Sequence, residues 1–499
     1  MRKKLLAKNT IASLTSQVVT LVCGFILPRY FLSFYGSEAN GLVNSITQFL
    51  SIISFLELGV GAVVQSSLYK PLAEKDSKQV SKVIVSANKF FRRLAQMLLV
   101  YVCVLVLFYP LIANQNFGYI YTATLIIAIS ISSFAQYYLG IVNTLLLNAD
   151  QRGYIQYNAQ TITVLLNTII CVVMISFSCS IQMVKLTTSI IYLIRPAILR
   201  RYVSKKYKID WNIKYNSEPI RQKWNGVAQH IAAVVLDGTD VIVLTLFSTL
   251  SNVSIYSVYY LVVKGVKTLF LSLTNGIESL MGDLWAKQES TKLYSLFGWV
   301  EWTIHTGTTL VFSCTAALIV PFIRIYTAGV HDANYVQPLF ATLLVLANAL
   351  HCLRLPYNIM VLAAGHYKQT QNNYIIAAIL NVVISVIAVQ HAGIIGVAIG
   401  TLVAMTYQTF WLSRYISKNL VNWPASHIFK QFLIDLVESF LISFSPKLYV
   451  WNVNTYIQWI TLSCFTLLIG LFIVIAINTV FYRDKVVLLL SKTKRKGAN

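Results

Sequence analysis

The sequence has few charged residues, and acidic ones are the scarcest. Charged residues make up 11% of the 499 positions, with 17 Asp and Glu against 40 Lys and Arg. A soluble chain carries about 25% charged residues, so this composition excludes an ordinary soluble domain. With 57% hydrophobic residues and a mean hydropathy of +0.65, the chain is predicted to be a polytopic membrane protein.

Motifs for catalysis and metal binding are also lacking. The seven cysteines include no CxxC pair, and no cluster of Cys and His indicates a metal site or a disulfide framework. No Walker A run, no HExxH motif and no serine–histidine–aspartate arrangement is evident. We therefore predict no enzyme activity, no metal and no cofactor. Coupling to a Na+ or H+ gradient is left open.

Long apolar segments are abundant. About 20 apolar residues cross a bilayer as a helix, because only a helix satisfies its own backbone there. The thirteenth of fourteen predicted spans is interrupted by Asp435 and Glu438, so an interfacial helix is the alternative for it. Small residues in 393–400 predict close helix packing. The predicted spans are about 10–34, 41–66, 93–113, 119–147, 156–177, 181–201, 226–248, 253–283, 295–322, 336–363, 372–390, 393–416, 431–449 and 456–481.

The Lys and Arg residues predict the orientation of these spans. When residues at the approximate span ends are counted with the connections, thirty-two of the forty lie at the two ends of the chain or in every second connection. Three lie in the other connections, and five lie within spans. Cytoplasmic connections carry the excess of Lys and Arg, so both termini are predicted to be cytoplasmic. The net charge of +23 thus reflects topology, and no nucleic-acid partner is predicted.

The two halves of the sequence resemble each other at an offset of about 214 residues. The clearest match pairs residues 148–173 with 362–387, each with a small turn, a helix start rich in Tyr, Asn and Gln, and Leu-Asn within the span. An offset of six helices preserves orientation, so the repeat is parallel, as in many transporters. We predict an N-terminal six-helix lobe (1–202), a cytoplasmic inter-lobe loop (203–225), a C-terminal six-helix lobe (226–417), and two additional helices with a basic cytoplasmic tail (418–499).

Several segments carry a family resemblance. They include residues 41–46 (GLVNSI), 55–59 (FLELG), Arg195-Pro196, 237–240 (DGTD) and 253–260 (VSIYSVYY). Across essentially its whole length, the chain resembles the polysaccharide-exporter branch of the MOP superfamily, the Wzx-type flippases, and most of all their Gram-positive members. MATE transporters and the lipid II flippase are relatives of this branch.

The resemblance implies a function. It predicts translocation of an undecaprenyl-pyrophosphate-linked oligosaccharide from the inner to the outer leaflet of the bacterial plasma membrane, for assembly of a surface polysaccharide such as a capsule or exopolysaccharide. The implied partners are the lipid-linked oligosaccharide, membrane lipids, a polysaccharide polymerase and glycosyltransferases. Glu57 stands where many relatives have Asp.

Five cations within the predicted spans are the candidate substrate ligands. A charge in the bilayer is costly, so it normally faces a cavity or a partner. Arg grips a diphosphate through paired hydrogen bonds and Lys acts as a point charge, so a cationic cavity suits an anionic lipid-linked substrate. Snorkelling is the alternative for two residues near span ends, Arg195 and Arg29. The five are Arg29, Arg195, Lys264, Lys267 and Arg354.

Acidic residues within the spans could pair with these cations, bind a coupling ion or carry protons. The predicted gating or ion-coupling residues are Glu57, Asp237 and Asp240. Asp237 and Asp240 are three residues apart and share a helix face. An Asp240–Arg29 or an Asp237–Lys264 pair would act as a gate or as a folding clamp.

Two other function classes compete with a flippase that works by alternating access. A MATE-type antiporter of drugs or metabolites, coupled to a cation, is the main alternative, but a carrier of organic cations calls for an acidic cavity. An oligosaccharide polymerase or ligase calls for a large outer loop, whereas the outer connections here are short. For the flippase, Tyr256, Tyr259 and Tyr260 are predicted to form a polar aromatic wall against the sugars.

Overall fold

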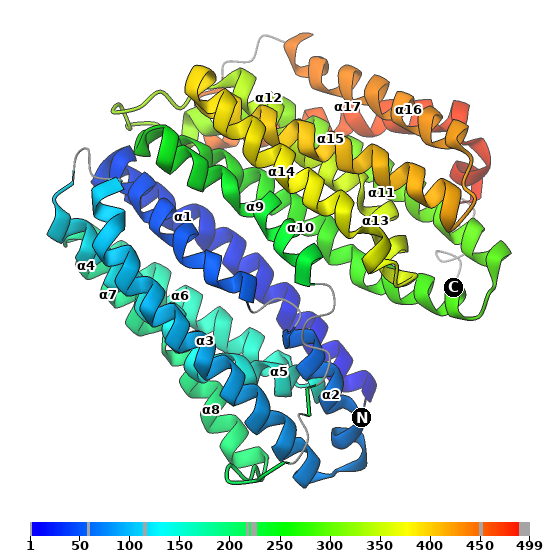
Figure 1. The fold of residues 1–499 in the computed structure, drawn as a ribbon. Coiled ribbons are helices and arrows are strands. Elements are labelled where there is room, and N and C mark those ends of the chain that lie inside the picture. Colours follow the sequence, from blue (N-terminus) through cyan, green and yellow to red (C-terminus); the bar gives the residue numbers. More distant parts are fainter. Residues whose placement is uncertain are drawn as a thin grey trace. The chain divides into compact units, whose positions relative to one another are not determined.

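The structure, a computed structural model, describes residues 2–56, 60–112, 117–215, 219–220, 227–448 and 453–488. Within these residues nearly all regular structure is helical and no strand occurs, which confirms the prediction of an all-α membrane protein. In chain order the elements are α1 (Arg2–Ser51), η1 (Ile52–Leu56), α2 (Val60–Glu74), α3 (Ser77–Ile112), α4 (Tyr119–Ala135), η2 (Gln136–Gly140), α5 (Ile141–Ala149), α6 (Tyr154–Ser176), α7 (Ile181–Tyr192), α8 (Ile194–Lys206), α9 (Val227–Phe247), α10 (Leu250–Ala286), α11 (Ser290–Tyr326), α12 (Pro338–Leu353), α13 (Leu355–Ala363), α14 (Tyr367–Ala392), α15 (Ile394–Asn419), α16 (Ala425–Phe444), η3 (Ser445–Leu448) and α17 (Tyr456–Phe481) (Figure 1).

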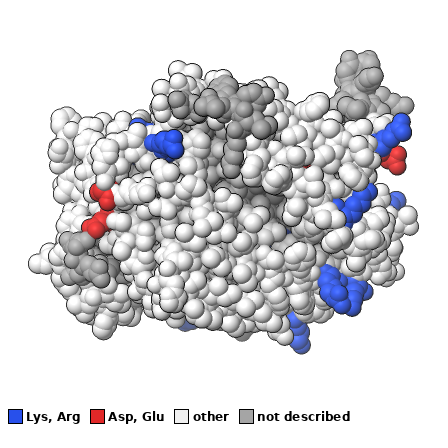
Figure 2. Space-filling model, turned by 90° about the horizontal axis from the view of Figure 1, so that it is seen from above, with Lys and Arg blue, Asp and Glu red and all other residues white. Residues whose placement is uncertain are grey.

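Among the described residues, each predicted span overlaps one helix or a series of consecutive helical elements. In the part of the chain that the structure describes, nine helical stretches are long and apolar enough to cross a bilayer. Their outward faces are apolar: on α17, Ile457, Leu468, Phe472 and Val480 are 66–78% exposed. Wide areas of the face drawn in Figure 2 carry no charged side chain. Such surfaces are stable against hydrocarbon and costly in water.

The first predicted span and the beginning of the second lie in one helical element. α1 runs from Arg2 to Ser51 across a kink at Gly36, whose φ of 81° and ψ of 175° are not helical. A positive φ is accessible to glycine without the steric penalty that a side chain brings. The connection predicted between these spans is therefore a single bend.

The basic segment between the second and third predicted spans is largely helical. α2 continues to Glu74, and α3 begins at Ser77 after a turn in which Lys75 has a φ of 57°. Asp76 accepts hydrogen bonds from the backbone N–H groups of Lys78 and Gln79, both at 3.0 Å, and so caps α3. Hydropathy alone missed this because a capped amphipathic helix continues past its apolar segment.

The chain divides into two compact units, Met1–Ser257 and Val258–Asn499. In the first unit α1 packs on α6 and α4 packs on α7, while α9 lies along the second half of α1 (Figure 1). Asn40 donates to Ser254 at 2.7 Å, and the hydroxyls of Ser45 and Thr245 lie 2.6 Å apart. These contacts hold α9 and the start of α10 against α1. The predicted lobe boundaries concern the sequence repeat and stay a prediction.

Asn40 and Ser254, which meet in this contact, are separated by 214 positions. This is also the offset at which the two halves of the sequence match.

In the second unit α14 and α15 pack closely against each other. A Cβ built on Gly396 would lie 2.3 Å from the carbonyl of Ala388, and one on Gly400 would lie 2.1 Å from Ser385 Oγ. Two helices approach this closely only where small residues face the partner. The prediction that small residues in 393–400 serve helix packing is confirmed for Gly396 and Gly400.

The last two helices of this unit pack on α11. α16 and α17 both contact α11 and each other. Asp435 and Glu438, the two acids that interrupt the thirteenth predicted span, lie on α16 and are 4% and 0% exposed. The twenty residues of α16 give a helix about 30 Å long. Its acidic residues are buried in the protein, so its apolar face is free to meet lipid.

The α14–α15 contact predicts the effect of a single methyl group. Gly396→Ala should lower the free energy of unfolding by about 1–3 kcal/mol, because the new Cβ meets backbone atoms that cannot move aside. Gly282→Ala is the matched control, since its Cβ would make ordinary contacts beginning at 3.6 Å in another helix of the same unit. Thermal unfolding in detergent measures both variants. Equal melting temperatures would contradict this packing.

Candidate functional site

The five predicted substrate-binding cations occupy different surroundings. Lys267 and Arg354 are buried, with 4% and 6% exposure, Lys264 is exposed, and Arg29 and Arg195 are half-buried. The ammonium groups of Lys264 and Lys267 lie 6.0 and 5.8 Å from the ring centre of Tyr260. These two lysines therefore share one face of α10.

Arg354 lies where two helices meet end to end. α12 stops at Leu353 and α13 starts at Leu355, with Pro356 in its first turn. A guanidinium nitrogen of Arg354 lies 3.2 Å from His351 Nδ1. Proline removes a backbone donor and interrupts a helix, so the sequence itself places this arginine at a break in the tenth span.

Arg195 follows a comparable break in the first unit. α7 ends at Tyr192, α8 begins at Ile194, and Pro196 occupies the first turn of α8. Arg195 contributes to the wall of a pocket of about 390 Å³. Its Nε is buried and has no hydrogen-bond partner among the described residues. Arg195 therefore places a positive charge in the pocket wall near the N-terminal end of a helix, where anions are stabilised.

Hydroxyl groups dominate the rest of this wall, which we call the Arg195 pocket. Thr47 donates to the carbonyl of Val43 at 2.7 Å, and Ser132 donates to that of Ile129 at 3.1 Å. A hydroxyl that donates in this way keeps lone pairs that can accept from a ligand. The polar lining comprises Thr47, Ser51, Ser54, Ser132, Ser133, Gln136, Tyr137, Tyr192 and Arg195.

An irregular turn borders the Arg195 pocket. Gln136–Gly140 (η2) is a π-helical turn between α4 and α5, and it packs against α8. At the repeat offset of 214, Gly140 corresponds to Arg354. The fourth and tenth spans are thus irregular at equivalent places. Interrupted helices at corresponding positions of two repeats are typical of transporter binding sites, and π turns often occur at functional sites.

The predicted gating residues are only partly within the described structure. Glu57 lies outside the described residues, as does the side chain of Asp237. Asp240 is 4% exposed and accepts a hydrogen bond from the Tyr256 hydroxyl at 2.8 Å. The roles of all three stay a prediction.

Two of the three tyrosines predicted to form an aromatic wall against the sugars are buried in the protein. Tyr256 is 3% exposed and bonds to Asp240. Tyr259 is fully buried, and its hydroxyl donates to the carbonyl of Tyr335 at 2.7 Å. Tyr260, beside the two lysines of α10, is half-buried. Two of the three tyrosines therefore serve the protein core.

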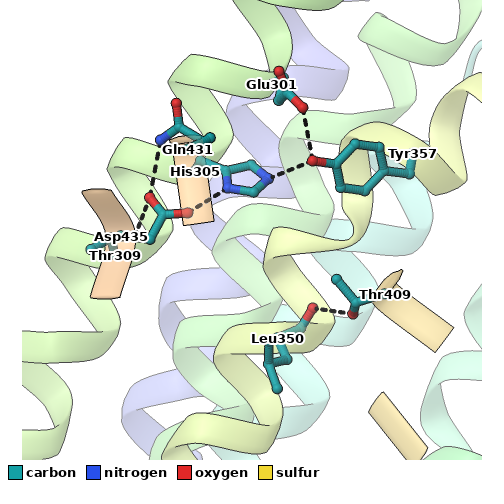
Figure 3. Close-up of polar contacts among 8 residues, drawn as sticks. All are labelled: Glu301, His305, Thr309, Leu350, Tyr357, Thr409, Gln431 and Asp435. Atoms are coloured by element: carbon teal, nitrogen blue, oxygen red, sulfur yellow. Dashed lines mark hydrogen bonds and ion pairs between the residues drawn. The ribbon is translucent and has the colours of Figure 1, made fainter. Parts of the chain in front are cut away.

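A second candidate site is a buried polar cluster in the second unit (Figure 3). His305 on α11 is fully buried, and its Nδ1 lies 2.6 Å from Asp435 Oδ2 on α16. Asp435 Oδ1 accepts from Thr309 Oγ1 and from Gln431 Nε2, both at 3.0 Å. This carboxyl group is thus held on both oxygens. We call the cluster the His305 network: Glu301, His305, Thr309, Tyr357, Gln431 and Asp435.

Tyr357 connects the other side of the network. Its hydroxyl donates to Glu301 Oε1 at 2.8 Å and lies 3.4 Å from His305 Nε2. Figure 3 shows the side chains of Glu301, Tyr357, His305 and Asp435 following one another across three helices. All four groups can exchange a proton, and they form a continuous hydrogen-bonded row.

Two further hydrogen bonds connect α17 to α11 and α16 beside the His305 network. Glu438 Oε1 accepts from Asn478 Nδ2 at 2.8 Å, and Asn478 Oδ1 accepts from Trp302 Nε1 at 2.6 Å. Glu438 Oε2 is buried without a hydrogen-bond partner in the described part of the chain. An ionised carboxylate is costly in such surroundings.

The His305 network borders a pocket of about 350 Å³, lined by Glu301 and Gln431 at one side and by Lys430 and Lys485 at another. The Lys485 ammonium donates to the carbonyl of Gly298 at 2.7 Å. Burial lowers the pKa of Lys485 to about 8, Glu301 raises it and Lys430 lowers it further. The pocket gives the network a route to solvent.

From the sequence, Asp435 and Glu438 were noted only as interruptions of a predicted span, and Glu301 and His305 were assigned no specific role. Glu301 and His305 are four residues apart on α11, and Asp435 and Glu438 are three apart on α16, so each pair shares a helix face. That spacing was the feature of the sequence from which the paired residues could have been found. Nothing in the sequence indicated which helices face each other. In the described residues, no group of three or more His, Cys, Asp or Glu is arranged to hold a metal ion.

The His305 network predicts a large effect on stability. Asp435→Ala should lower the free energy of unfolding by about 3–5 kcal/mol, because it removes the acceptor for three buried groups. Asp283→Ala is the control, since Asp283 pairs with Lys287 on the exposed surface at 2.7 Å and such pairs contribute about 0–1 kcal/mol. Thermal unfolding measures both. Similar losses for the two variants would contradict the network.

Comparison with known proteins places the fold. No protein-family model and no curated protein matches the chain. Among solved structures, the lipid II flippase MurJ in an inward closed conformation matches with a TM-score of 0.73 at 16% identity, over 96% of this chain and 99% of that one. An inward-facing multidrug resistance MATE family transporter of the MOP superfamily matches with 0.62 at 16% identity, over 82% and 98%. The MATE multidrug transporter DinF-BH matches with 0.59 at 13% identity, over 83% and 95%. This chain is a multi-pass membrane protein with the fold shared by MurJ and the MATE transporters.

Proposed function

We propose that the protein is a flippase that moves an undecaprenyl-pyrophosphate-linked oligosaccharide from the inner to the outer leaflet, for assembly of a surface polysaccharide. The two halves of the repeat would alternate in opening to either side. The proposal places the protein in a bacterial plasma membrane, with both termini cytoplasmic. A polysaccharide polymerase and glycosyltransferases are the proposed protein partners, and the protein itself carries out no covalent chemistry.

The Arg195 pocket is the observation that carries this proposal. A lipid-linked oligosaccharide combines a negatively charged diphosphate with a hydroxyl-rich glycan. The pocket combines the positive charge of the Arg195 guanidinium with a wall of serine and threonine hydroxyls. An arginine binds phosphate oxygens through charge-assisted hydrogen bonds, and hydroxyls exchange hydrogen bonds with sugars. Both halves of the substrate thus find matching groups in one pocket.

The buried cations of the second unit support the same charge preference. Lys267 and Arg354 are nearly inaccessible in membrane helices, where a positive charge is retained only for a partner or a function. Arg354 also occupies a helix break that corresponds to the η2 turn of the first unit. A substrate carrying negative charge would find cationic groups in both units, with Arg29 and Lys264 as further candidates.

The extent of the fold favours the flippase over the MATE-type antiporter. The MATE structures match 82–83% of this chain, whereas MurJ matches 96%. The share left unmatched by the MATE structures is about that of residues 418–499, which form α16, α17 and the tail. An antiporter of organic cations also has no evident use for buried Lys267 and Arg354.

Energy coupling to a Na+ or H+ gradient belongs to the proposal. For H+, we assign the His305 network as the candidate. Its carboxyl groups on α11 and α16, with Glu438 beside them, outnumber the one imidazole and the nearby ammonium of Lys485. An excess of buried acids over bases has to bind protons to avoid net buried charge, and the adjoining pocket provides solvent access.

The Arg195 pocket predicts which arginine matters for export. Arg195→Gln should reduce delivery of the lipid-linked oligosaccharide to the outer leaflet by about tenfold or more, because a charge-assisted contact to phosphate is lost. Arg195→Lys should retain part of the activity, since it keeps the charge and loses the paired donors. Export is measured as the ratio of outer-leaflet to inner-leaflet oligosaccharide in cells.

Arg201→Gln is the matched control for this experiment. Arg201 lies further along α8 and is exposed, so its loss should leave export unchanged. Immunoblotting establishes equal protein levels for the three variants. Full export by Arg195→Gln would remove the pocket from the mechanism.

The charge distribution predicts the topology of the chain. Single cysteines introduced at Asp76 and Gln288 in a cysteine-free background should react with a membrane-impermeant maleimide only after the inner face is opened. Cysteines at Gly118 and Asn454 should react in intact cells, because these turns lie at the opposite helix ends. Labelling of the first pair in intact cells would reverse the proposed orientation.

A further inference from the structure

The first unit contains a second and larger pocket, outside the Arg195 pocket. Its volume is about 560 Å³. Lys89, Arg92 and Arg93 line it from α3, Arg200 lines it from α8, and Trp211 lines it from the segment that follows α8. We call it the basic pocket. Four cations from two helices that are far apart in the sequence converge on one hollow.

The charge of the basic pocket is not balanced within its wall. No Asp or Glu is among the described residues that line it. The guanidinium of Arg92 lies 4.9 Å from the ring centre of Tyr138, which orients the cation without neutralising it. The four cations are exposed to solvent. The pocket therefore offers positive charge to a ligand at little desolvation cost.

Neutral hydrogen-bond donors complete the wall. The side-chain amides of Asn88, Gln96 and Asn143 line the same hollow, and an amide NH2 can donate to a phosphate oxygen. A band of snorkelling cations at a membrane surface needs neither a hollow nor inward-facing amides. The combination of charge, donors and enclosure is that of a binding site for an anion.

The basic pocket and the Arg195 pocket meet at the η2 turn. Tyr137 lines both of them, and it is 7% exposed. Tyr138 and Leu139 of the same π-helical turn line only the basic pocket, whereas Gln136 lines only the Arg195 pocket. A single irregular turn thus separates a strongly basic pocket from a pocket with one arginine.

We propose that the basic pocket binds a phosphate or diphosphate group of an anionic ligand. Arginines and lysines at phosphate sites provide charge-assisted hydrogen bonds, and several of them around one hollow suit a group with more than one negative charge. The ligand comes either from the surrounding membrane, as a phospholipid headgroup, or from solution, as a free diphosphate. This site does not depend on the proposed transport function.

Two binding measurements on the purified full-length protein distinguish the sources. In the first, protein in phosphatidylcholine nanodiscs is titrated with inorganic pyrophosphate by calorimetry. In the second, protein in detergent is mixed with phosphatidylglycerol, and bound lipid is counted by native mass spectrometry. Pyrophosphate binding identifies a site for soluble diphosphate, and phosphatidylglycerol binding alone identifies a headgroup site.

Variants locate the binding. Arg92→Gln with Arg93→Gln should weaken it by about tenfold or more, since two charge-assisted contacts are lost. Arg414→Gln with Lys418→Gln removes the same charge from an exposed face of α15 and should change binding by less than about twofold.

A third variant and a series of salt concentrations provide independent tests of the site. Arg200→Gln, from the opposite wall on α8, should weaken binding even if the α3 double variant folds poorly. Raising the ionic strength should weaken binding to the wild type, because the contacts are solvent-accessible. The proposal is overturned if the wild type binds neither anion, or if the two double variants weaken binding equally.

Discussion

The cost of a charge or an unsatisfied polar group away from water governs this structure. In a bilayer each such group must find a partner within the protein or face a polar pocket. In the second unit, polar groups find partners within the protein: His305 and Asp435 hydrogen-bond to each other, and Tyr357 donates a hydrogen bond to Glu301. In the first unit, a charged group lies in the wall of a polar pocket: Arg195 lines a pocket that is rich in hydroxyl groups. One physical rule thus yields a cluster that fastens helices and a pocket that can accept a ligand.

Helix interruptions determine where these groups lie. Pro196 and Pro356 follow breaks in the sixth and tenth spans, and each is close behind an arginine. The η2 turn interrupts the fourth span at the position that corresponds to Arg354 in the repeat. Broken helices release backbone groups that regular helices bind internally, so they cluster at substrate sites in transporters. The irregular points of the two halves therefore carry the functional proposal.

Much of the fold could be predicted because membrane spans are encoded in local composition. Fourteen apolar segments gave the helices, and the glycines of 393–400 gave one close helix pair. Local composition could not show that α2 continues to Glu74 and that α3 begins already at Ser77, where Asp76 caps an amphipathic helix that starts before the apolar stretch. It also could not give Gly36 as the single bend between two spans.

The candidate sites show the limit more clearly. The five intramembrane cations stood out because each is a costly exception in an apolar segment. Snorkelling was an alternative for Arg195, since its distance from a span end was the only criterion that the sequence offered. Its pocket depends on α1, α4 and η2, which are remote in the sequence. The His305 network was missed for the same reason, because His305 and Asp435 are 130 residues apart.

The central claim is that cations within the membrane helices select an anionic lipid-linked cargo, and reconstitution tests it most directly. The purified protein in liposomes would be offered a fluorescent saccharide on undecaprenyl pyrophosphate, with a fluorescent organic cation offered in parallel. We predict that the lipid-linked saccharide crosses the bilayer faster than in empty liposomes, and that the organic cation does not. Transport of the organic cation without movement of the lipid-linked saccharide would contradict it.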